Sequence, residues 1–556
     1  LYAWAVVFPS IIMNMKKSII KGVFALATLA LTMTSCNKFL DENPNPRYVD
    51  GNNPYLISRF LTYSYPLSSV AYISELASDN NYEDIEGNPY RDRFLDEAFQ
   101  WKDISQTGGF ADYDGPAALW EQYYYPIAQA NEVLTLIQES GDEGPRNLAS
   151  RGEALAVRAW AHFQLANVFC LPYNYDEQGG ATNLGIPYVK ERVTTLLPDY
   201  PRGTLKETYE LIEQDLLAAI PLLEKYADYK EEVKRFHFTP EAAYAFAARF
   251  YLYYNKPEKA KEYADKVLGA DPRSRLRQWE SIFANINAEN VNAKALAYSS
   301  LAEPANLLVV SLKSNYPSLT TSGEYFTATR YAHQNRTADE ETLWANIWNK
   351  GGAHDEYNFS PYIFNKVYTD KVYQPKMPDL GNGRTKEVLL TTDELLINRA
   401  EAEVRLGDYE AALRDLNAWT DVYLRKSVAK RTFTEAELKA YYDKLPYADK
   451  TTMSPKKHIT GAHFTLHDGS KITEGTRAEI LLQYVLQCRR VLSLHEGLRW
   501  QDIKRYGITV YHWRKTDLGA GTYEVKDDGI LKGNDLRQAI FLPEQAVTGK
   551  IKQNPR

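Results

Sequence analysis

Cysteine is scarce in this chain of 556 residues, which contains three: Cys36, Cys170 and Cys488. No two of them have the CxxC spacing of a redox motif or a zinc site. Cys170 and Cys488 lie in apolar segments that we expect to be helical, so we predict two buried thiols, with a bridge between them as the alternative. This cysteine content excludes a disulfide framework.

The motifs of several enzyme classes are also missing. The chain has no G-x-S-x-G nucleophile elbow, no P-loop and no glycine fingerprint of a dinucleotide site. His495-Glu496 lacks the second histidine of HExxH, so it does not indicate zinc. We therefore predict no catalytic residues and no cofactor.

One acidic loop, at residues 79–90, invites comparison with a calcium site. Aligning Gly87 with the invariant glycine of an EF-hand places Tyr82 at the first ligand position. The same alignment places Arg93 at the twelfth position, which requires a bidentate glutamate. The loop therefore does not fit a calcium site, and we predict no metal.

A membrane-spanning apolar run is missing from the N-terminal region. The apolar segment Ile19–Leu31 is shorter than the ~20 residues that a helix needs to cross a bilayer. It follows a basic stretch at residues 15–17 and ends in small residues before Cys36, an order typical of a secretory signal peptide. The junction resembles a bacterial lipobox, in which the cysteine is acylated. The alternatives are an N-terminal helix of the fold and an ordinary cleaved signal.

These features predict three N-terminal segments. Residues 1–14 are expected to be translated upstream sequence, residues 15–35 a lipoprotein signal peptide, and residues 36–50 a flexible tether that begins at lipidated Cys36. Met13 and Met15 both remain open as the true start.

Basic residues are fewer than acidic ones, 65 against 72, and the formal net charge is −7. Without residues 1–35 the charge becomes −10, because that segment contains three lysines and no acidic residue. An acidic protein is poorly suited to nucleic acid or to anionic lipid headgroups. We therefore expect no nucleic-acid partner, and membrane attachment through acyl chains alone.

Aromatic residues, in contrast, are abundant, with 41 Tyr, 20 Phe and 10 Trp. Much of this content must fill a core, but flat rings can also stack on planar faces of a ligand. Tyrosine in such excess therefore also suits a surface that stacks on a ligand.

Residues 51–556 read as one mainly α-helical domain. Apolar residues recur at spacings of three and four over about 116–170, which predicts a pair of helices. Two further pairs, at about 239–272 and 392–423, have the helix, turn, helix order and length of a tetratricopeptide repeat. Such pairs cannot bury their apolar faces alone, so we expect them to stack into a scaffold. Single helices are predicted at about 53–77 and 204–224.

Residues 273–390 interrupt this pattern with a long irregular region. It contains one strand-like run, Asn306–Leu312, and many aromatic residues among Ser, Thr, Asn and Gly. Irregular insertions of this length are usually functional. We predict a loop-rich, ligand-facing region; the alternative is that its aromatic rings form a satellite core under the loops.

Three charged or titratable residues in predicted helices are better explained by structure than by chemistry. His162 lies in a helix that is apolar on almost every side, so we expect a buried, hydrogen-bonded imidazole. Arg499 and Asp502 are spaced i,i+3 on a helix, so we expect them to pair with each other.

Several motifs, in their order along the chain, resemble the SusD/RagB family of outer-membrane lipoproteins of Bacteroidetes. The motifs are Lys38-Phe39-Leu40-Asp41, Arg158-Ala159-Trp160-Ala161-His162-Phe163, Leu184-Gly185-Ile186-Pro187-Tyr188, Glu496-Gly497-Leu498-Arg499-Trp500-Gln501-Asp502 and Ile540-Phe541-Leu542-Pro543. The resemblance extends over nearly all of residues 36–556.

The resemblance implies a cell-surface, lipid-anchored protein of the outer membrane that binds a glycan and passes it to a SusC-like TonB-dependent transporter. It also implies a ligand surface built from the loop at about 79–101 and the region at 273–390. Candidate ligand-binding residues there are Asp79, Asn81, Tyr82, Trp101, Tyr316, Tyr325, Tyr331, Trp344 and Trp348. Two alternatives remain: an all-helical surface glycoside hydrolase that uses two carboxylates, and a binding protein for a non-glycan nutrient such as peptide.

We predict that Cys36 carries the lipid anchor, because it directly follows the small residues at the end of the signal-like segment. Metabolic labelling with a palmitate analogue should tag the wild-type protein and should not tag Cys36→Ser. Equal labelling of the two proteins would contradict the prediction.

Overall fold

The computed structural model describes most of the chain after residue 51. The described residues are 52–83, 93–109, 111–193, 200–280, 291–316, 331–333, 366, 369–370, 384–424, 430–461, 463–517 and 522–556. The predicted signal peptide, Cys36 and the tether therefore lie outside the described residues.

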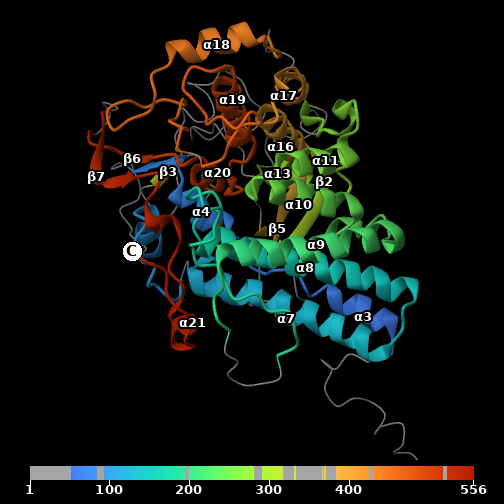
Figure 1. The fold of residues 1–556 in the computed structure, drawn as a ribbon. Helices are drawn as coiled ribbons and strands as arrows, with labels where there is room; N and C mark the ends of the chain where they lie inside the picture. Colours follow the sequence, from blue (N-terminus) through green and yellow to red (C-terminus); the bar gives the residue numbers. More distant parts are fainter. Residues whose placement is uncertain are drawn as a thin grey trace, which may run out of the picture.

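Helices make up most of the described part of the chain (Figure 1). The α-helices are α3 Pro54–Leu61, α4 Ala71–Ala77, α5 Arg93–Phe99, α6 Ala111–Asp114, α7 Pro116–Ser140, α8 Pro145–Phe169, α9 Leu205–Tyr226, α10 Pro240–Tyr253, α11 Pro257–Leu268, α13 Val291–Tyr298, α16 Thr392–Arg405, α17 Tyr409–Tyr423, α18 Glu435–Lys444, α19 Arg477–Leu492, α20 Leu498–Tyr506 and α21 Glu544–Thr548. Short 3₁₀ turns are η1 Lys234–Phe236, η2 Pro272–Arg275 and η3 Leu536–Gln538. The prediction of a mainly α-helical fold is confirmed.

Helix pairs occupy the three ranges in which the sequence predicts them: α7–α8, α10–α11 and α16–α17. Local signals explain their ends. The hydroxyl of Thr239 accepts a hydrogen bond from Ala242 N and Pro240 fills the first turn of α10, where no amide hydrogen is needed. Gly407, with φ +81°, makes the turn between α16 and α17.

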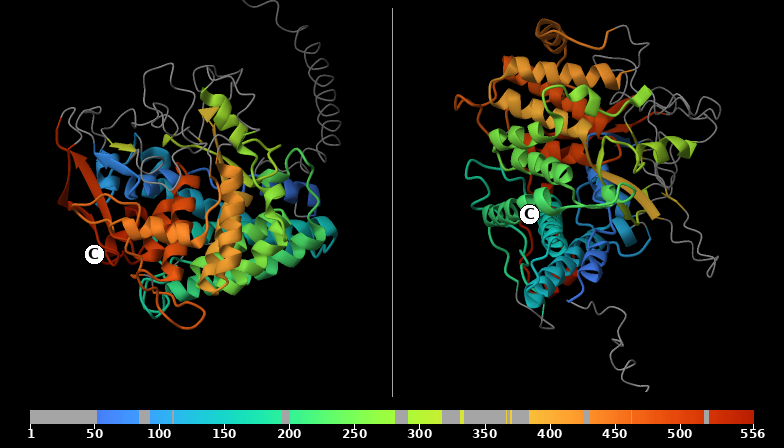
Figure 2. Two further views of the ribbon diagram at one scale, coloured as in Figure 1. Left: turned by 90° about the horizontal axis from the view of Figure 1, so that it is seen from above. Right: turned by 90° about the vertical axis from the view of Figure 1, so that its right-hand side faces the viewer.

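The pairs pack on one another as stacked layers. α9 lies along α8, which lies along α7, and α11 packs against α16 (Figures 1 and 2). The capping box of Thr204 and Glu207 fixes the start of α9, since each side chain accepts a hydrogen bond from the other residue's backbone amide.

The prediction of one helix over residues 53–77 is wrong, because the segment forms α3 and α4 with an irregular connection between them. Pro66 lies in that connection, and a proline inside a helix removes a hydrogen bond and clashes with the preceding turn. The backbone of the connection bonds elsewhere: Leu67 O accepts a 2.7 Å hydrogen bond from Lys313 N, directly after the strand Asn306–Leu312.

Two small sheets complete the described fold. One has the order β3–β1–β6–β7, from strands Tyr331–His333, Asn81–Glu83, Val510–Lys515 and Tyr523–Leu531. The other has the order β2–β5–β4, from Asn306–Leu312, Arg384–Thr391 and Thr369–Asp370. Strand β2 coincides with the strand-like run seen in the sequence, whereas the other strands were not predicted.

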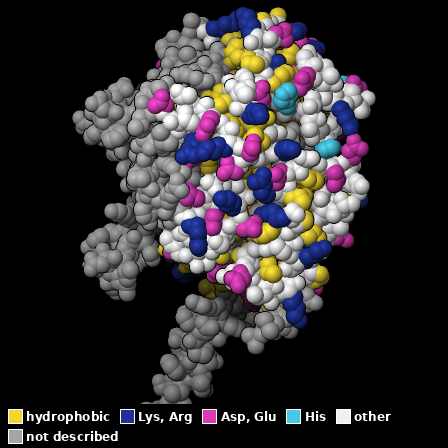
Figure 3. Space-filling view, turned by 90° about the vertical axis from the view of Figure 1, so that its left-hand side faces the viewer, with side chains coloured by type: hydrophobic (Ala, Val, Ile, Leu, Met, Phe, Trp, Pro, Cys, Tyr) yellow, Lys and Arg dark blue, Asp and Glu magenta, His cyan; other side chains and the backbone are white. Residues whose placement is uncertain are grey.

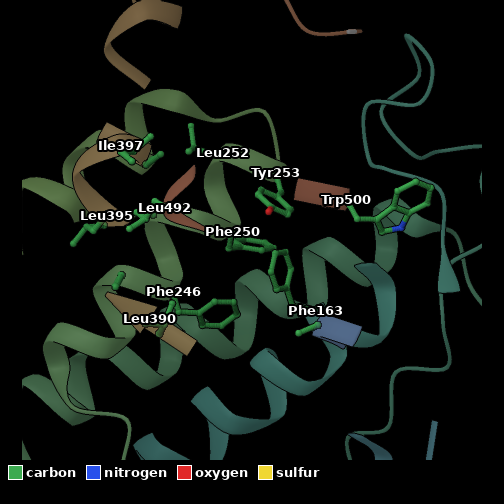
Figure 4. Close-up of a cluster of buried hydrophobic side chains, with 14 of the residues drawn as sticks. Phe163, Phe246, Phe250, Leu252, Tyr253, Leu390, Leu395, Ile397, Leu492 and Trp500 are labelled. Atoms are coloured by element: carbon green, nitrogen blue, oxygen red, sulfur yellow. The ribbon is translucent and has the colours of Figure 1, made fainter. Parts of the chain in front are cut away.

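The main core lies where the helix pairs meet the end of β5 (Figure 4). Phe163 from α8 contacts Phe246 from α10, with ring centroids 5.5 Å apart, and Phe250 lies 6.0 Å from Phe163. Leu395 of α16 and Leu492 of α19 complete this part of the core (Figure 4). Much of the aromatic content therefore packs the interior.

Both described cysteines are buried and free, which confirms the prediction of two separate thiols. His162 is buried and hydrogen-bonded as expected: Nδ1 lies 2.8 Å from Arg158 O, and Nε2 accepts a 3.1 Å hydrogen bond from Val189 N. Burial lowers its pKa to about 3. In the described ranges, no helix is long and apolar enough to cross a membrane.

A buried network of charges joins α16, α19 and α20. Glu401 accepts hydrogen bonds of 2.6 Å from Arg489 and of 2.8 Å from Arg505, and Asp502 Oδ1 accepts 2.8 Å bonds from the same two arginines. The expected pairing of Arg499 with Asp502 is therefore wrong. Asp502 is occupied by two other arginines, and Arg499 reaches a more distant carboxylate that is described below.

Removal of the Glu401 charge should destabilise the fold strongly. Burial alone raises the pKa of Glu401, but Arg505 and Arg489 hold it well below its usual range, so the carboxylate is ionised. Glu401→Gln leaves two buried arginines with Asp502 Oδ1 as their shared carboxylate partner, and loss of one partner of a buried pair costs ~3–5 kcal/mol. Denaturant unfolding should show this loss.

Glu410→Gln is the matched control, because Glu410 forms an exposed ion pair with Arg477. It should leave the unfolding midpoint unchanged, since exposed pairs contribute little. A Glu401→Gln protein as stable as this control would contradict the expected role of the network.

Candidate ligand-binding site

Strand β1 brings together the two parts of the chain that the sequence analysis assigned to one ligand surface. It pairs antiparallel with β3, with Asn81 opposite His333 and Glu83 opposite Tyr331. On its other side it runs parallel to β6, with Glu83 opposite Arg514. The loop after α4 and the long irregular region therefore meet in one sheet.

A hollow of about 220 Å³ opens beside this sheet, and we call it the sheet hollow. It is lined by residues from β1, the end of α5, β6 and β7: Glu83, Phe99, Gln100, His512, Trp513, Arg514, Lys526, Asp528 and Gly529. The face of the molecule that carries β6 and β7 shows basic, acidic and apolar side chains interspersed (Figure 3).

Stacked rings form one wall of the sheet hollow. The imidazole of His512 lies between Phe99 and Trp101, with ring centroids 4.0 and 4.2 Å away and planes within 18° of parallel. Its Nε2 donates a 2.8 Å hydrogen bond to Ser78 O. Burial lowers the pKa of His512 to about 4, so it is neutral near pH 7 and acts as a flat ring.

Charged side chains form the rim. Glu83 Oε2 and Arg514 Nε are 3.6 Å apart, and their side chains are 12% and 31% exposed. Lys526 and Asp528 come from a bulge in β7, where the register passes from Trp513 opposite Val525 to Tyr511 opposite Ile530. Bulges of this kind redirect side chains near functional sites.

Tyr82 and Trp513 form a small apolar cluster next to the hollow, apart from the main core. The ring of Tyr523 meets Tyr82 edge-on at 5.6 Å. Tyr82 is buried in this cluster, which contains no described residue of the region 273–390, so the alternative given for that region stays a prediction.

Asp79 is buried and surrounded by cations. Its carboxylate accepts hydrogen bonds of 2.7 and 2.8 Å from Arg499, and Lys457 Nζ lies 3.2 Å away. Burial by itself raises the pKa of Asp79, but Arg490, Arg499 and Lys457 hold it well below its usual range. The neighbouring Asn81 is also buried, and its side-chain amide donates to Glu75 O.

Trp101 and Tyr316 are interior residues as well. The indole of Trp101 donates a 2.9 Å hydrogen bond to Ala77 O and stacks on His512. Tyr316 stacks on Tyr72 with ring centroids 5.0 Å apart. A ligand could reach these rings only if part of the protein moved away.

The remaining candidates are placed only in part. Tyr331 lies in β3, where the backbone is described, and Tyr325, Trp344 and Trp348 lie outside the described residues. The ligand-binding role of all nine candidates remains a prediction, and for the five buried ones the contacts give a structural role.

The sequence analysis missed Trp513, Arg514, Lys526 and Asp528 as candidates. A sequence signal exists at residues 508–513, a short run rich in β-branched and aromatic residues, as strands are. The run is short and follows a predicted helix, so it is a weaker signal than the apolar spacing of the helices.

Several buried carboxyl groups, among them Asp393 and Glu403, have raised pKa values, and three of them bear on whether the protein is an enzyme. Burial raises the pKa of Glu75, Asp114 and Glu387 to about 7. Asp114 binds the start of the long irregular region, accepting hydrogen bonds from Ser314 Oγ at 2.6 Å and Asn315 N at 2.7 Å. None of these three carboxyl groups lines the sheet hollow. The groups whose pKa would suit a general acid near pH 7 therefore lie inside the fold and not at the hollow.

Metal ligands do not gather in the part of the chain that the structure describes. There, no group of three or more His, Cys, Asp or Glu side chains could hold an ion. The charged residues of the sheet hollow are instead arranged as hydrogen-bond donors and acceptors around a ring-lined wall.

Two family models match the chain. A model described as starch-binding associating with outer membrane matches residues 38–252, and the model of the SusD family matches residues 254–545. No curated protein matches the chain.

Solved structures share the fold at low sequence identity. A SusD superfamily protein from Bacteroides thetaiotaomicron is 16% identical with a TM-score of 0.58, over 91% of this chain and 100% of the other. A SusD-like carbohydrate binding protein from Bacteroides vulgatus is 16% identical with a TM-score of 0.53, over 86% and 89%. A laminarin binding SusD-like protein is 15% identical with a TM-score of 0.51, over 91% and 100%.

Proposed function

The chain belongs to the SusD family, and from this premise we propose that it binds a glycan at the outer membrane and passes it to a SusC-like TonB-dependent transporter. Proteins of this family are in general carbohydrate-binding proteins associated with the outer membrane. The observation that carries the proposal is the sheet hollow, where rings and hydrogen-bonding groups meet at the junction of β1 and β6.

The chemistry of the hollow suits a sugar. A pyranose ring presents C–H groups on its face and hydroxyl groups around its edge, so it needs a flat apolar wall and a polar rim. Trp513, Phe99 and His512 line the hollow with the small exposed part of their rings, which are 7%, 4% and 3% exposed, so the apolar wall they supply is narrow. Arg514 and Lys526 can donate hydrogen bonds to hydroxyl oxygens, and Glu83 and Asp528 can accept from hydroxyl hydrogens.

Binding without catalysis fits this arrangement best. A glycoside hydrolase needs one carboxyl group that is protonated at working pH and lies beside the scissile bond. Glu75, Asp114 and Glu387, whose pKa values are raised to about 7, are all buried away from the sheet hollow. A peptide or another nutrient stays as the alternative ligand, because a polar rim does not by itself select sugars.

Glycan binding is tested with the full-length lipoprotein in detergent against soluble polysaccharides, beginning with starch and laminarin. Affinity electrophoresis should show retardation by at least one polysaccharide. Arg514→Ala/Asp528→Ala should weaken that binding about tenfold or more, since each hydrogen bond to a charged group contributes ~1.5–3 kcal/mol and a decade costs ~1.4 kcal/mol. No product of hydrolysis should appear on long incubation.

The matched control is Lys439→Ala/Asp443→Ala, which removes the same charges from an exposed ion pair on α18. It should change neither binding nor melting. Trp101→Ala serves as the comparison for a core effect, because truncation of a buried tryptophan costs ~3–5 kcal/mol. Binding of peptides in place of every glycan, or release of shorter sugars, would favour one of the alternatives.

The transporter partnership has a separate test. Purification of the tagged protein from its native cells in a mild detergent should co-isolate a large TonB-dependent transporter. Recovery of the lipoprotein alone in several detergents would count against this part of the proposal, while leaving glycan binding open to the first experiment.

A further inference from the structure

A second and larger hollow, of about 550 Å³, lies between the end of α3, the first half of α7, η1 and strand β2. Its volume falls in the range of small-molecule sites. We call it the tyrosine hollow, because Tyr63, Tyr65 and Tyr125 line it. In Figure 1, β2 lies on the opposite side of the molecule from β6 and β7, so the two hollows are separate.

Two of these tyrosines expose their rings. Tyr63 is 62% exposed and Tyr125 is 43% exposed. Glu121 lies one helical turn before Tyr125 on α7, so both face the hollow from the same side of the helix. Large exposed rings on the walls of a concave surface are typical of a binding site.

A buried carboxylate holds the other side of the hollow in place. Glu153 accepts hydrogen bonds from Tyr65 Oη at 2.6 Å, Tyr229 Oη at 2.8 Å and His237 Nδ1 at 2.8 Å. The ring of Tyr229 also stacks on His237, with centroids 4.4 Å apart and planes 6° from parallel. With Nδ1 bonded to Glu153, Nε2 is the ring nitrogen through which His237 would bond a ligand in the hollow.

This arrangement is more than an apolar groove. A fixed imidazole, a carboxylate at Glu121 and an amide at Gln122 surround the exposed rings, so the hollow offers both stacking surfaces and oriented hydrogen-bonding groups. An apolar peptide would leave these polar groups without partners, whereas a sugar ring would satisfy them with its hydroxyls.

We infer that the tyrosine hollow is a second carbohydrate subsite, in which sugar rings stack on Tyr63 and Tyr125 and their hydroxyls bond to His237, Glu121 and Gln122. The inference rests on the proposed glycan function and extends it. A polysaccharide chain long enough to reach both hollows gains affinity from the second contact, because that contact becomes intramolecular. A short oligosaccharide occupies one hollow at a time and does not gain in this way.

The test uses the full-length lipoprotein in detergent and a polysaccharide that retards it in affinity electrophoresis, with starch and laminarin as the first probes. Tyr63→Ala/Tyr125→Ala should weaken binding of the polysaccharide about tenfold, with an unchanged melting temperature, because both rings are exposed. Glu121→Ala removes no ring and should also weaken binding. Tyr55→Ala is the control, since Tyr55 is 68% exposed and does not line the hollow.

The outcomes separate this inference from the proposed function. If the wild-type protein binds a polysaccharide and both Tyr63→Ala/Tyr125→Ala and Glu121→Ala bind it equally well, the subsite is overturned while glycan binding stands. If the double variant loses stability, Glu121→Ala decides alone. If the wild-type protein binds no carbohydrate, both proposals fail.

Discussion

Buried arginine–carboxylate pairs connect the helical scaffold to the candidate site, and two neighbouring residues of α19 show how. Arg489 faces Glu401 of α16, whereas Arg490 faces the other way and donates to Asn80 Oδ1 and Asp79 O, each at 2.8 Å. Helix α20 also contacts both acidic residues: Arg505 donates a hydrogen bond to Glu401, and Arg499 donates one to Asp79. An unpaired charge in the interior is costly, so α19 and α20 must keep their contacts with Glu401 and with the Asp79 segment at the same time. The position of β1, and so of the sheet hollow, therefore depends on both ion clusters.

This dependence explains why Tyr82 and Trp101 lie inside the fold. The segment from Asp79 to Asn81 is held under the surface by Arg490 and Arg499, and Trp101 covers it together with His512. These contacts fix where the chain enters β1. Glu83 is the first residue of β1 whose side chain reaches the hollow. The polar loop seen in the sequence is thus anchored at Asp79 and Asn80, and its described part reaches the sheet hollow at Glu83.

The helices could be predicted from the sequence because their signals are local. Apolar spacing, the cap at Thr239 and Gly407 at a turn all act within a few residues. The partners of buried charges could not be predicted from the sequence. Arg499, for example, binds Asp79, which is 420 positions away, and not Asp502, which is three positions away. The exposure of aromatic side chains could not be predicted either. The sequence shows where rings occur, but only the packing shows that Trp101 is buried and Tyr63 is exposed. Tyr63 and Tyr125 lie within the predicted helices at 53–77 and 116–170, where residue type does not show which rings are exposed.

The two hollows differ in how firmly their polar groups are held, and this difference bears on what each contributes. In the sheet hollow, Glu83 and Arg514 form a partly exposed pair at 3.6 Å, which is weak and leaves both side chains able to turn toward a ligand. In the tyrosine hollow, the buried Glu153 fixes Tyr65 and His237 before any ligand arrives. Ordering side chains on binding costs free energy, so a wall that is already ordered loses less. If both hollows bind sugars as proposed, the ordering of Tyr65 and His237 therefore costs less free energy on binding than the ordering of Glu83 and Arg514.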